Sequence, residues 1–371
     1  MKKYYISALA LLATVSGCKP VEIVNENVAV EMETVLHKNK LLEKSENKHG
    51  VESFEDLTTN DYRDAIKHGV ALQKAEIKAI AENKQPPTFE NTIAALDQSG
   101  EALERATSTF YPLTSSNSTE EYRDLAKEIQ PILSAHSDDM YMNEQLFSRV
   151  KSVYDDASSE QLTHEQQKVL EKIYRQFERS GANLSAENKE KLRQLNQEIS
   201  ALQLQFSNNL LHETNNTFVK VEDVRELEGL SQGDIDRASA MAEEQGEEGK
   251  WFFNMQRASC NPVLQYCKNR ELRRRVYEAY CNRGNTDNEY DNKEISTKLV
   301  RLRLERARLM GFKNCASQIL DTRMAKTPEA VYNLLDQIWT PAVAKAKEEL
   351  NDIREEMKKD GLDCEPEGWD Y

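Results

Sequence analysis

Several features that define common classes of protein are scarce or missing in this sequence of 371 residues. It has 13 glycines and 9 prolines, too few for a collagen-like or low-complexity disordered chain. No apolar run reaches the roughly eighteen residues that a mature transmembrane helix needs. Positive charge is in deficit, because 49 Lys and Arg face 64 Asp and Glu, for a net charge of -15. Such a chain would repel a phosphate backbone, so we expect no nucleic-acid partner.

Known catalytic and metal-binding motifs are missing as well. There is no Gly-x-Ser-x-Gly turn, no Gly-rich phosphate loop and no closely spaced cysteine pair. His164-Glu165 and His212-Glu213 begin like a zinc motif, which needs a second histidine four residues after the first. Lys168 and Asn216 stand at those positions, so we predict that both pairs are solvated helix residues. No residue is therefore assigned as catalytic or as a metal ligand.

Three further groups of residues favour structural interpretations. Apart from Cys18, the cysteines are odd in number and widely spaced, which predicts free thiols rather than a disulfide framework. They are Cys260, Cys267, Cys281, Cys315 and Cys364. The arginines at 270, 273, 274 and 275 have Glu271 and Glu278 as neighbours, which predicts a salt-bridged helix face. Residues 284–292 only loosely resemble a calcium loop, and we expect a solvated capping loop.

The N-terminus has a pattern that predicts an export signal. Lys2 and Lys3 precede a short apolar stretch from Ile6 to Val15, and small residues stand before Cys18. This pattern resembles a bacterial lipobox, so we expect a lipoprotein signal peptide over 1–17 and lipid attachment at Cys18. An ordinary secretory signal with a chance cysteine is the alternative. Residues 18–52 lack a sustained apolar period and predict a flexible tether, with the protein exported and anchored on the periplasmic or cell-surface side.

The body from residue 53 to 371 predicts a mainly α fold of long paired helices. Apolar residues recur at steps of three and four, most clearly in one stripe: Leu192, Leu195, Ile199, Leu202, Phe206 and Leu210. Three helix starts carry N-cap signals: Thr88 before Ile93 and Leu96, Thr163 with Gln166, and Thr327 with Pro328. A later helix is expected from about Pro341 to Lys359, ended by Gly361. Residues 217–221 and 251–253 predict a small β hairpin.

Collinear phrases resemble one family, the thimet oligopeptidase-like zinc metallopeptidases, which includes oligopeptidase A and bacterial peptidyl-dipeptidase. The phrases are Pro87-Thr88-Phe89-Glu90-Asn91-Thr92-Ile93, Asn143-Glu144-Gln145-Leu146-Phe147, Phe177-Glu178-Arg179-Ser180-Gly181, Asn269-Arg270-Glu271-Leu272-Arg273, Arg306-Ala307-Arg308-Leu309-Met310-Gly311 and Met324-Ala325-Lys326-Thr327-Pro328. The last of these, with the closing Trp369-Asp370-Tyr371, looks most like the peptidyl-dipeptidase branch. The resemblance runs from about residue 53 to the end and implies the N-terminal half of a neurolysin-like fold.

The same resemblance implies an activity whose catalytic groups are not in this chain. Family members cut short peptides with zinc held by His-Glu-x-x-His and a later Glu, which lie beyond the Trp369-Asp370 phrase. We therefore expect one wall of a peptide channel, inactive and without bound zinc on its own, with the missing catalytic half as a candidate partner. The alternative is a non-catalytic helical lipoprotein that binds peptides or a partner. An unrelated helical surface protein is the remaining interpretation.

Overall fold

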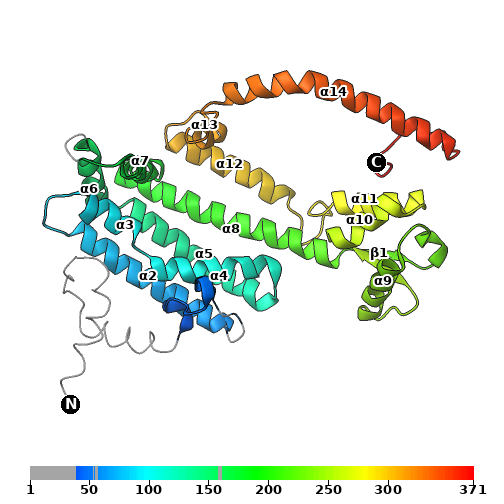
Figure 1. Cartoon of the computed structure of the whole chain (residues 1–371), viewed down its shortest axis with the longest axis horizontal. Helices are drawn as coiled ribbons and strands as arrows, with labels where there is room; N and C mark the ends of the chain where they lie inside the picture. Colours follow the sequence, from blue (N-terminus) through cyan, green and yellow to red (C-terminus); the bar gives the residue numbers. More distant parts are fainter. Residues whose placement is uncertain (1–38, 53, 55–56, 158–160) are drawn as a thin grey trace, which may run out of the picture. The chain divides into compact units, whose positions relative to one another are not determined.

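A computed structural model describes residues 39–52, 54, 57–157 and 161–371 (Figure 1). The predicted signal peptide, Cys18 and the first part of the predicted tether lie outside these residues. The chain divides into two compact units, Met1–Arg193 and Gln194–Tyr371. The described residues are mainly helical with one small antiparallel sheet, which confirms the predicted fold class. Within this part of the chain, no helix combines the length and apolar character that crossing a membrane requires.

The first unit is an all-helical body. Its elements are η1 (Lys40–Leu42), η2 (Lys48–Gly50), α2 (Thr59–Ala81), η3 (Phe89–Ala94), α3 (Ala95–Asp97), α4 (Glu101–Ser116), α5 (Glu120–Tyr141), α6 (Glu144–Asp155) and α7 (His164–Arg179). Helix α2 packs against α4 and α5, where the rings of Tyr62 and Phe110 lie 5.6 Å apart (Figure 1). Apolar side chains of η3, α6 and α7 form a second buried cluster around Ile93, Leu146 and Phe177.

The predicted cap at Thr88 is confirmed, and a buried arginine reinforces it. The Thr88 side chain accepts from the Asn91 N–H, and the Asn91 side chain accepts from the Thr88 N–H. Arg149 of α6 donates to the carbonyls of Asn83 at 2.7 Å and Gln85 at 3.0 Å and to the Asn91 side chain at 2.9 Å. The two terminal nitrogens of this guanidinium thus fix the turn before η3, whereas its buried Nε has no hydrogen-bond partner in the described structure.

The packed structure begins earlier in the chain than residue 53, where the sequence places the start of the body. Leu41 and Leu42, inside the predicted tether 18–52, are buried against α2 and α4. The Asn39 side chain accepts from the Leu41 N–H and donates to the Asp61 carbonyl at 2.7 Å. Two adjacent leucines give no helical period, so spacing alone could not place them in the core.

The second unit combines helices with the two-stranded sheet. Helix α8 (Ala186–Asn216) begins in the first unit and continues into the second. The other elements are β1 (Phe218–Val221), η4 (Val224–Leu227), α9 (Gln232–Glu244), β2 (Trp251–Asn254), α10 (Arg257–Tyr266), α11 (Arg270–Cys281), α12 (Lys293–Leu309), α13 (Cys315–Leu320) and α14 (Pro328–Lys359). Strands β1 and β2 pair antiparallel, with Val219 opposite Phe253, so the predicted strand pair is confirmed. Helix α9 lies in their connection.

Two apolar clusters hold this unit together. One joins both strands to α10 and α11 through Val221, Phe253 and Leu272, among others. The other places Ile199 of α8 against Ile295 and Leu299 of α12, so the predicted α8 stripe faces a core. Cys260 and Cys267 are buried free thiols, Cys315 is half-buried, and Cys281 and Cys364 are exposed. These five cysteines of the described residues are all free, as predicted.

The last helix differs from its predicted bounds. It starts at Pro328, after the N-cap Thr327, and runs without interruption to Lys359 (Figure 1). Pro341 therefore lies inside α14, although the sequence predicts a helix start there. Proline frees the carbonyl four residues before it, and residue 337 is exposed, so water can bind that carbonyl. The predicted stop is confirmed, because Gly361 has a φ of 81° and the Leu362 N–H donates to the Met357 carbonyl.

Candidate functional site

A buried carboxylate near the end of α8 organises the loop between α11 and α12. Glu213 is 3% exposed and accepts from the Gly284 N–H at 2.5 Å, the Thr286 hydroxyl at 2.5 Å and the Asn288 amide at 2.6 Å. The prediction that His212-Glu213 is a solvated pair is therefore wrong for Glu213. The glutamate faces a loop about seventy residues further along the chain, and a helical period cannot reveal such a partner.

The environment of Glu213 favours its charged form. Burial alone would raise the pKa of this carboxyl, but the donors Thr286, Gly284 and Asn288 outweigh burial and hold the pKa below its usual range. The neighbouring His212 ring stacks on Tyr290 of the same loop, with ring centroids 3.6 Å apart. Glu213 is thus a structural anchor whose oxygens already have protein donors.

The rest of the loop is tied down by its own side chains. Asn209 of α8 donates to the Asn292 side chain at 3.1 Å, and both residues are buried. Asp291 accepts from the Lys293 N–H at 2.8 Å, at the start of α12. The Lys293 ammonium lies 2.5 Å from Asp287 and 3.1 Å from Asp291. Residues 284–292 therefore form a capping loop, as predicted, and Lys293 pairs with two of its acidic side chains.

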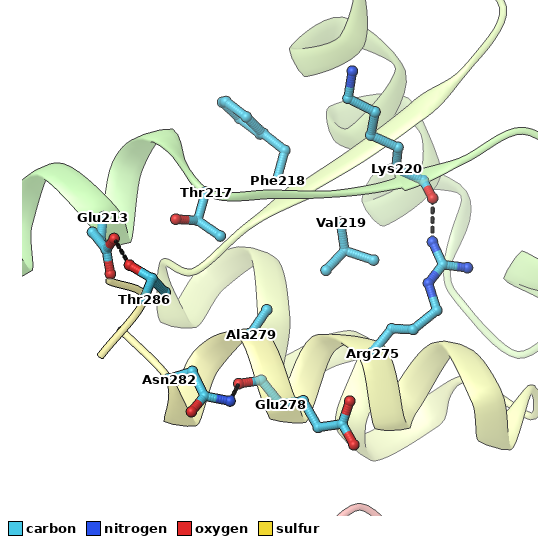
Figure 2. Close-up of a pocket in the computed structure, with 10 residues that line it drawn as sticks. All are labelled: Glu213, Thr217, Phe218, Val219, Lys220, Arg275, Glu278, Ala279, Asn282 and Thr286. Carbon is cyan, nitrogen blue, oxygen red and sulfur yellow. Dashed lines mark hydrogen bonds between the residues drawn. The ribbon is translucent and has the colours of Figure 1, made fainter. Parts of the chain in front are cut away.

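A pocket of about 440 Å³ lies between strand β1, helix α11 and this loop (Figure 2). Ten residues line it: Glu213, Thr217, Phe218, Val219, Lys220, Arg275, Glu278, Ala279, Asn282 and Thr286. Figure 2 shows the Val219 and Ala279 side chains between the strand and the helix, with Arg275 and Glu278 on the same helix. The pocket therefore combines apolar side chains with charges of both signs.

The charged groups of the pocket have protein partners. Arg275 donates to the Lys220 carbonyl of β1 and forms an ion pair with Glu226 at 3.2 Å. Lys220 pairs with Glu247 at 2.5 Å, and Glu278 accepts from Arg274 at 2.7 Å. No lining residue is a histidine, cysteine or serine, and the hydroxyl of the lining Thr286 donates to the Glu213 carboxylate, which also accepts from Gly284 and Asn288.

Two arginines at the start of α11 bind the C-terminal segment rather than glutamates of their own helix. The Asp370 side chain is 2% exposed and accepts from Arg270 at 2.7 and 2.9 Å and from Arg273 at 3.2 Å. Burial would raise the pKa of the Asp370 carboxyl, but Arg270, the Glu367 N–H and Arg273 together lower it. Trp369 packs edge-on against Tyr277, with ring centroids 5.9 Å apart.

The predicted salt-bridged helix face therefore holds for only part of the arginine cluster. Arg274 pairs with Glu271 and, at 2.7 Å, with Glu278, as the i,i+3 and i,i+4 spacing predicts. The sequence predicts the same pairing for Arg270 and Arg273, but their partner Asp370 lies about a hundred residues further along the chain. Arg273 also donates to the Trp369 carbonyl at 2.9 Å. The sequence did not predict this anchor. Its one signal is Asp370, an acidic residue near the end of the chain without a partner at helical spacing.

The described residues do not offer a zinc site. His164 and Glu165 are exposed on the first turn of α7, as predicted for a solvated pair. Within residues 39–371, apart from the masked positions, no three His, Cys, Asp or Glu side chains converge as metal ligands. His212 stacks on an aromatic ring and Glu213 is fully occupied by donors, so neither fits the requirements of a ligand.

Comparison with known proteins places this helical chain in a class of peptidases. The sequence model of Peptidase family M3 matches residues 263–371. The dipeptidyl carboxypeptidase of Escherichia coli is 33% identical over 320 residues, which cover 86% of this chain and 47% of the relative. That of Salmonella typhimurium is 31% identical, covering 90% and 49%. Oligopeptidase A of Haemophilus influenzae is 30% identical, covering 87% and 48%.

The chain belongs to peptidase family M3, as its phrases predict. It spans about half the length of these curated relatives. The resemblance covers both units, whereas the family model matches only the part from the end of α10 onward.

Proposed function

We propose that this chain is the helical, non-catalytic half of an M3 peptidase that acts on short peptides. One observation carries the proposal: similarity extends over 86–90% of the chain but over only 47–49% of two dipeptidyl carboxypeptidases. In this proposal the chain forms a wall beside the substrate. Zinc and the groups that activate water belong to the part of the relatives that the chain does not span.

The side chains support a role in shaping a surface rather than in bond cleavage. Glu213 and Asp370 are buried carboxylates, but each is held by two or more protein donors and is unavailable as a general base. The pocket beside β1 has apolar side chains and paired charges, which suit contact with a peptide. In the proposed role, these groups select and orient substrate.

A second candidate is a stand-alone lipoprotein that binds peptides or a partner. The pocket of Figure 2 is the observation that favours it, since a binding module needs no metal. The exposed apolar side chains of α14 favour the first candidate, because a stand-alone module would be expected to cover them.

The experiment is zinc analysis and peptide cleavage with the chain lacking residues 1–18. A short peptide with a free C-terminus is incubated with and without chelator, and the Escherichia coli dipeptidyl carboxypeptidase serves as the positive control. We expect less than stoichiometric zinc and no turnover. Stoichiometric zinc with chelator-sensitive release of dipeptides would contradict the proposal, because the chain would then hold a complete catalytic site.

We also propose that the protein is exported and anchored through lipid on Cys18, facing the periplasm or the cell surface. The charged start, the apolar stretch and the small residues before Cys18 support this. Labelled palmitate should enter the wild-type chain and be absent from Cys18→Ser. Equal labelling of both would refute the assignment.

A further inference from the structure

The pocket of Figure 2 runs along the main chain of strand β1. Four consecutive residues, 217–220, line it. Successive side chains of a strand point to opposite faces, and Figure 2 shows Phe218 and Lys220 on one side of the strand and Val219 on the other. A pocket that all of these residues line cannot lie over one face of the strand alone. It therefore also follows an edge of β1.

That edge of β1 is not used for pairing within the sheet. The sheet of the described residues has two strands, and β2 pairs along one edge of β1, with Lys220 opposite Phe252. The Lys220 carbonyl accepts from Arg275 of α11, so the main chain of this residue is directed toward the helix. In an antiparallel pair the N–H and the C=O of one residue point the same way. The Lys220 N–H therefore faces the pocket as well.

Helix α11 supplies the floor of the pocket. Arg275, Glu278, Ala279 and Asn282 stand three, one and three residues apart, which places them on one helix face. Figure 2 shows Ala279 and Val219 between the helix and the strand, so the central part of the floor is small and apolar. Arg275 and Glu278 beside it already have protein partners. An apolar side chain suits this floor better than a charged one.

The dimensions suit a short extended segment. Four strand residues span about 13 Å at about 3.3 Å per residue. The pocket encloses about 440 Å³, which lies within the usual range for ligand sites of about 300–1,000 Å³. A strand edge with outward N–H and C=O groups is complementary to another extended main chain, which it can pair with whatever the side chains are.

We propose that β1 takes up an extended peptide segment as a third strand, paired along the edge that carries the Lys220 N–H. An apolar side chain of the peptide then lies between Val219 and Ala279. Main-chain pairing gives affinity for many sequences, and the floor gives a preference at one position. This inference rests on the proposed function, because it states how the proposed wall holds its peptide.

The first test changes the peptide and leaves the protein intact. The full chain is titrated with an end-blocked pentapeptide that has valine at its centre and threonine elsewhere, and Kd is measured. Blocked ends remove the terminal charges, so only the main chain and the side chains contribute. The comparison peptide has the same side chains but carries methyl groups on its main-chain nitrogens, which removes the donors that a strand needs.

The second test changes the protein. Lys220→Pro removes the N–H that faces the pocket, and an edge strand tolerates proline where the nitrogen points away from the ladder. Lys220→Ala is the matched control, since both variants lose the ion pair with Glu247 and only the proline loses the N–H. Ala279→Leu fills the floor, and Ala240→Leu makes the same change at an exposed position of α9 outside the pocket. Circular dichroism and urea midpoints establish that each variant is folded.

We expect the unmodified peptide to bind one to one and the methylated peptide to bind about tenfold more weakly, or less. Lys220→Pro should bind the unmodified peptide about tenfold more weakly than Lys220→Ala, and Ala279→Leu about tenfold more weakly than Ala240→Leu, which should match wild type. Equal binding of the two peptides, equal binding by the two Lys220 variants, or no binding of the unmodified peptide would overturn the proposal.

These readouts involve neither zinc nor cleavage. Zinc-dependent turnover by the chain would contradict the proposed function and leave the paired strand standing. Failure of the peptide to bind would contradict the paired strand and leave the assignment as a non-catalytic half untouched.

Discussion

Replacing Glu213 by glutamine tests whether this carboxylate anchors the loop after α11. Glutamine keeps one oxygen, which can still serve Thr286 and Asn288, but it turns an N–H group toward the Gly284 N–H. One charge-assisted hydrogen bond, worth about 1.5–3 kcal/mol, is lost, and an unsatisfied buried donor adds about 1–3 kcal/mol. We expect the free energy of unfolding of the second unit to fall by about 3 kcal/mol.

Urea unfolding followed by circular dichroism, with hydrogen exchange over residues 282–292 as a local readout, measures this change. Glu278→Gln is the matched control, since the same chemical change occurs at a side chain that is 46% exposed. Its ion pair with Arg274 is worth about 0–1 kcal/mol. A loss below about 1 kcal/mol for Glu213→Gln, with unchanged exchange in the loop, would refute the reasoning.

The pH dependence of the free energy of unfolding, compared between wild type and Glu213→Gln, gives an independent check. The pKa of the Glu213 carboxyl is lowered in the folded protein from its ordinary value of 4.5. The folded state therefore binds fewer protons than the unfolded state in this range. The stabilising effect of the charged Glu213 carboxylate is fully present above the pKa that this group has in the unfolded state. The difference between wild type and Glu213→Gln should shrink as the pH falls from 4.5 through the lowered pKa.

The remaining predictions concern both units. Gly69→Ala should lower the free energy of unfolding by about 2–4 kcal/mol, because a Cβ there would lie 2.8 Å from the Leu103 Cα. Gly233→Ala, at an exposed position of α9, should raise the free energy of unfolding by about 0.5–1 kcal/mol. Urea midpoints of the two variants that move in the same direction would contradict this contrast. Burial lowers the pKa of His136, so the folded state binds fewer protons and the urea midpoint should fall as the pH drops below 6.5. His136→Gln should weaken that dependence, and the exposed His164→Gln should leave it unchanged.

Local features of the fold could be predicted from the sequence because they depend on neighbours in the chain. The Thr163 capping box, the Thr327 cap and the α8 stripe all involve residues within a few turns of one another. The strand pair could be predicted because both segments are short, apolar and flanked by turn residues. In each case the physical cause lies within the segment itself.

The long-range anchors could not be predicted in this way. Glu213 meets its donors more than seventy residues away, and Asp370 meets Arg270 a hundred residues away. A lone glutamate on a helix looks solvated until its partner loop is known. Pro341 misled for a related reason, since a proline favours a helix start but tolerates an exposed helix interior. Family resemblance, rather than residue spacing, identified the class of peptidase.

The support of α14 at its two ends has a kinetic consequence. Ordering a flexible segment costs about 1–2 kcal/mol per residue in backbone entropy, and a disordered partner bears that cost at the moment of binding. Helix α14 is already formed and capped, by Thr327 before it and by Gly361 after it. Any partner of its face therefore meets a rigid rod, and association can proceed as a single docking step whose rate is set by diffusion and orientation rather than by helix formation.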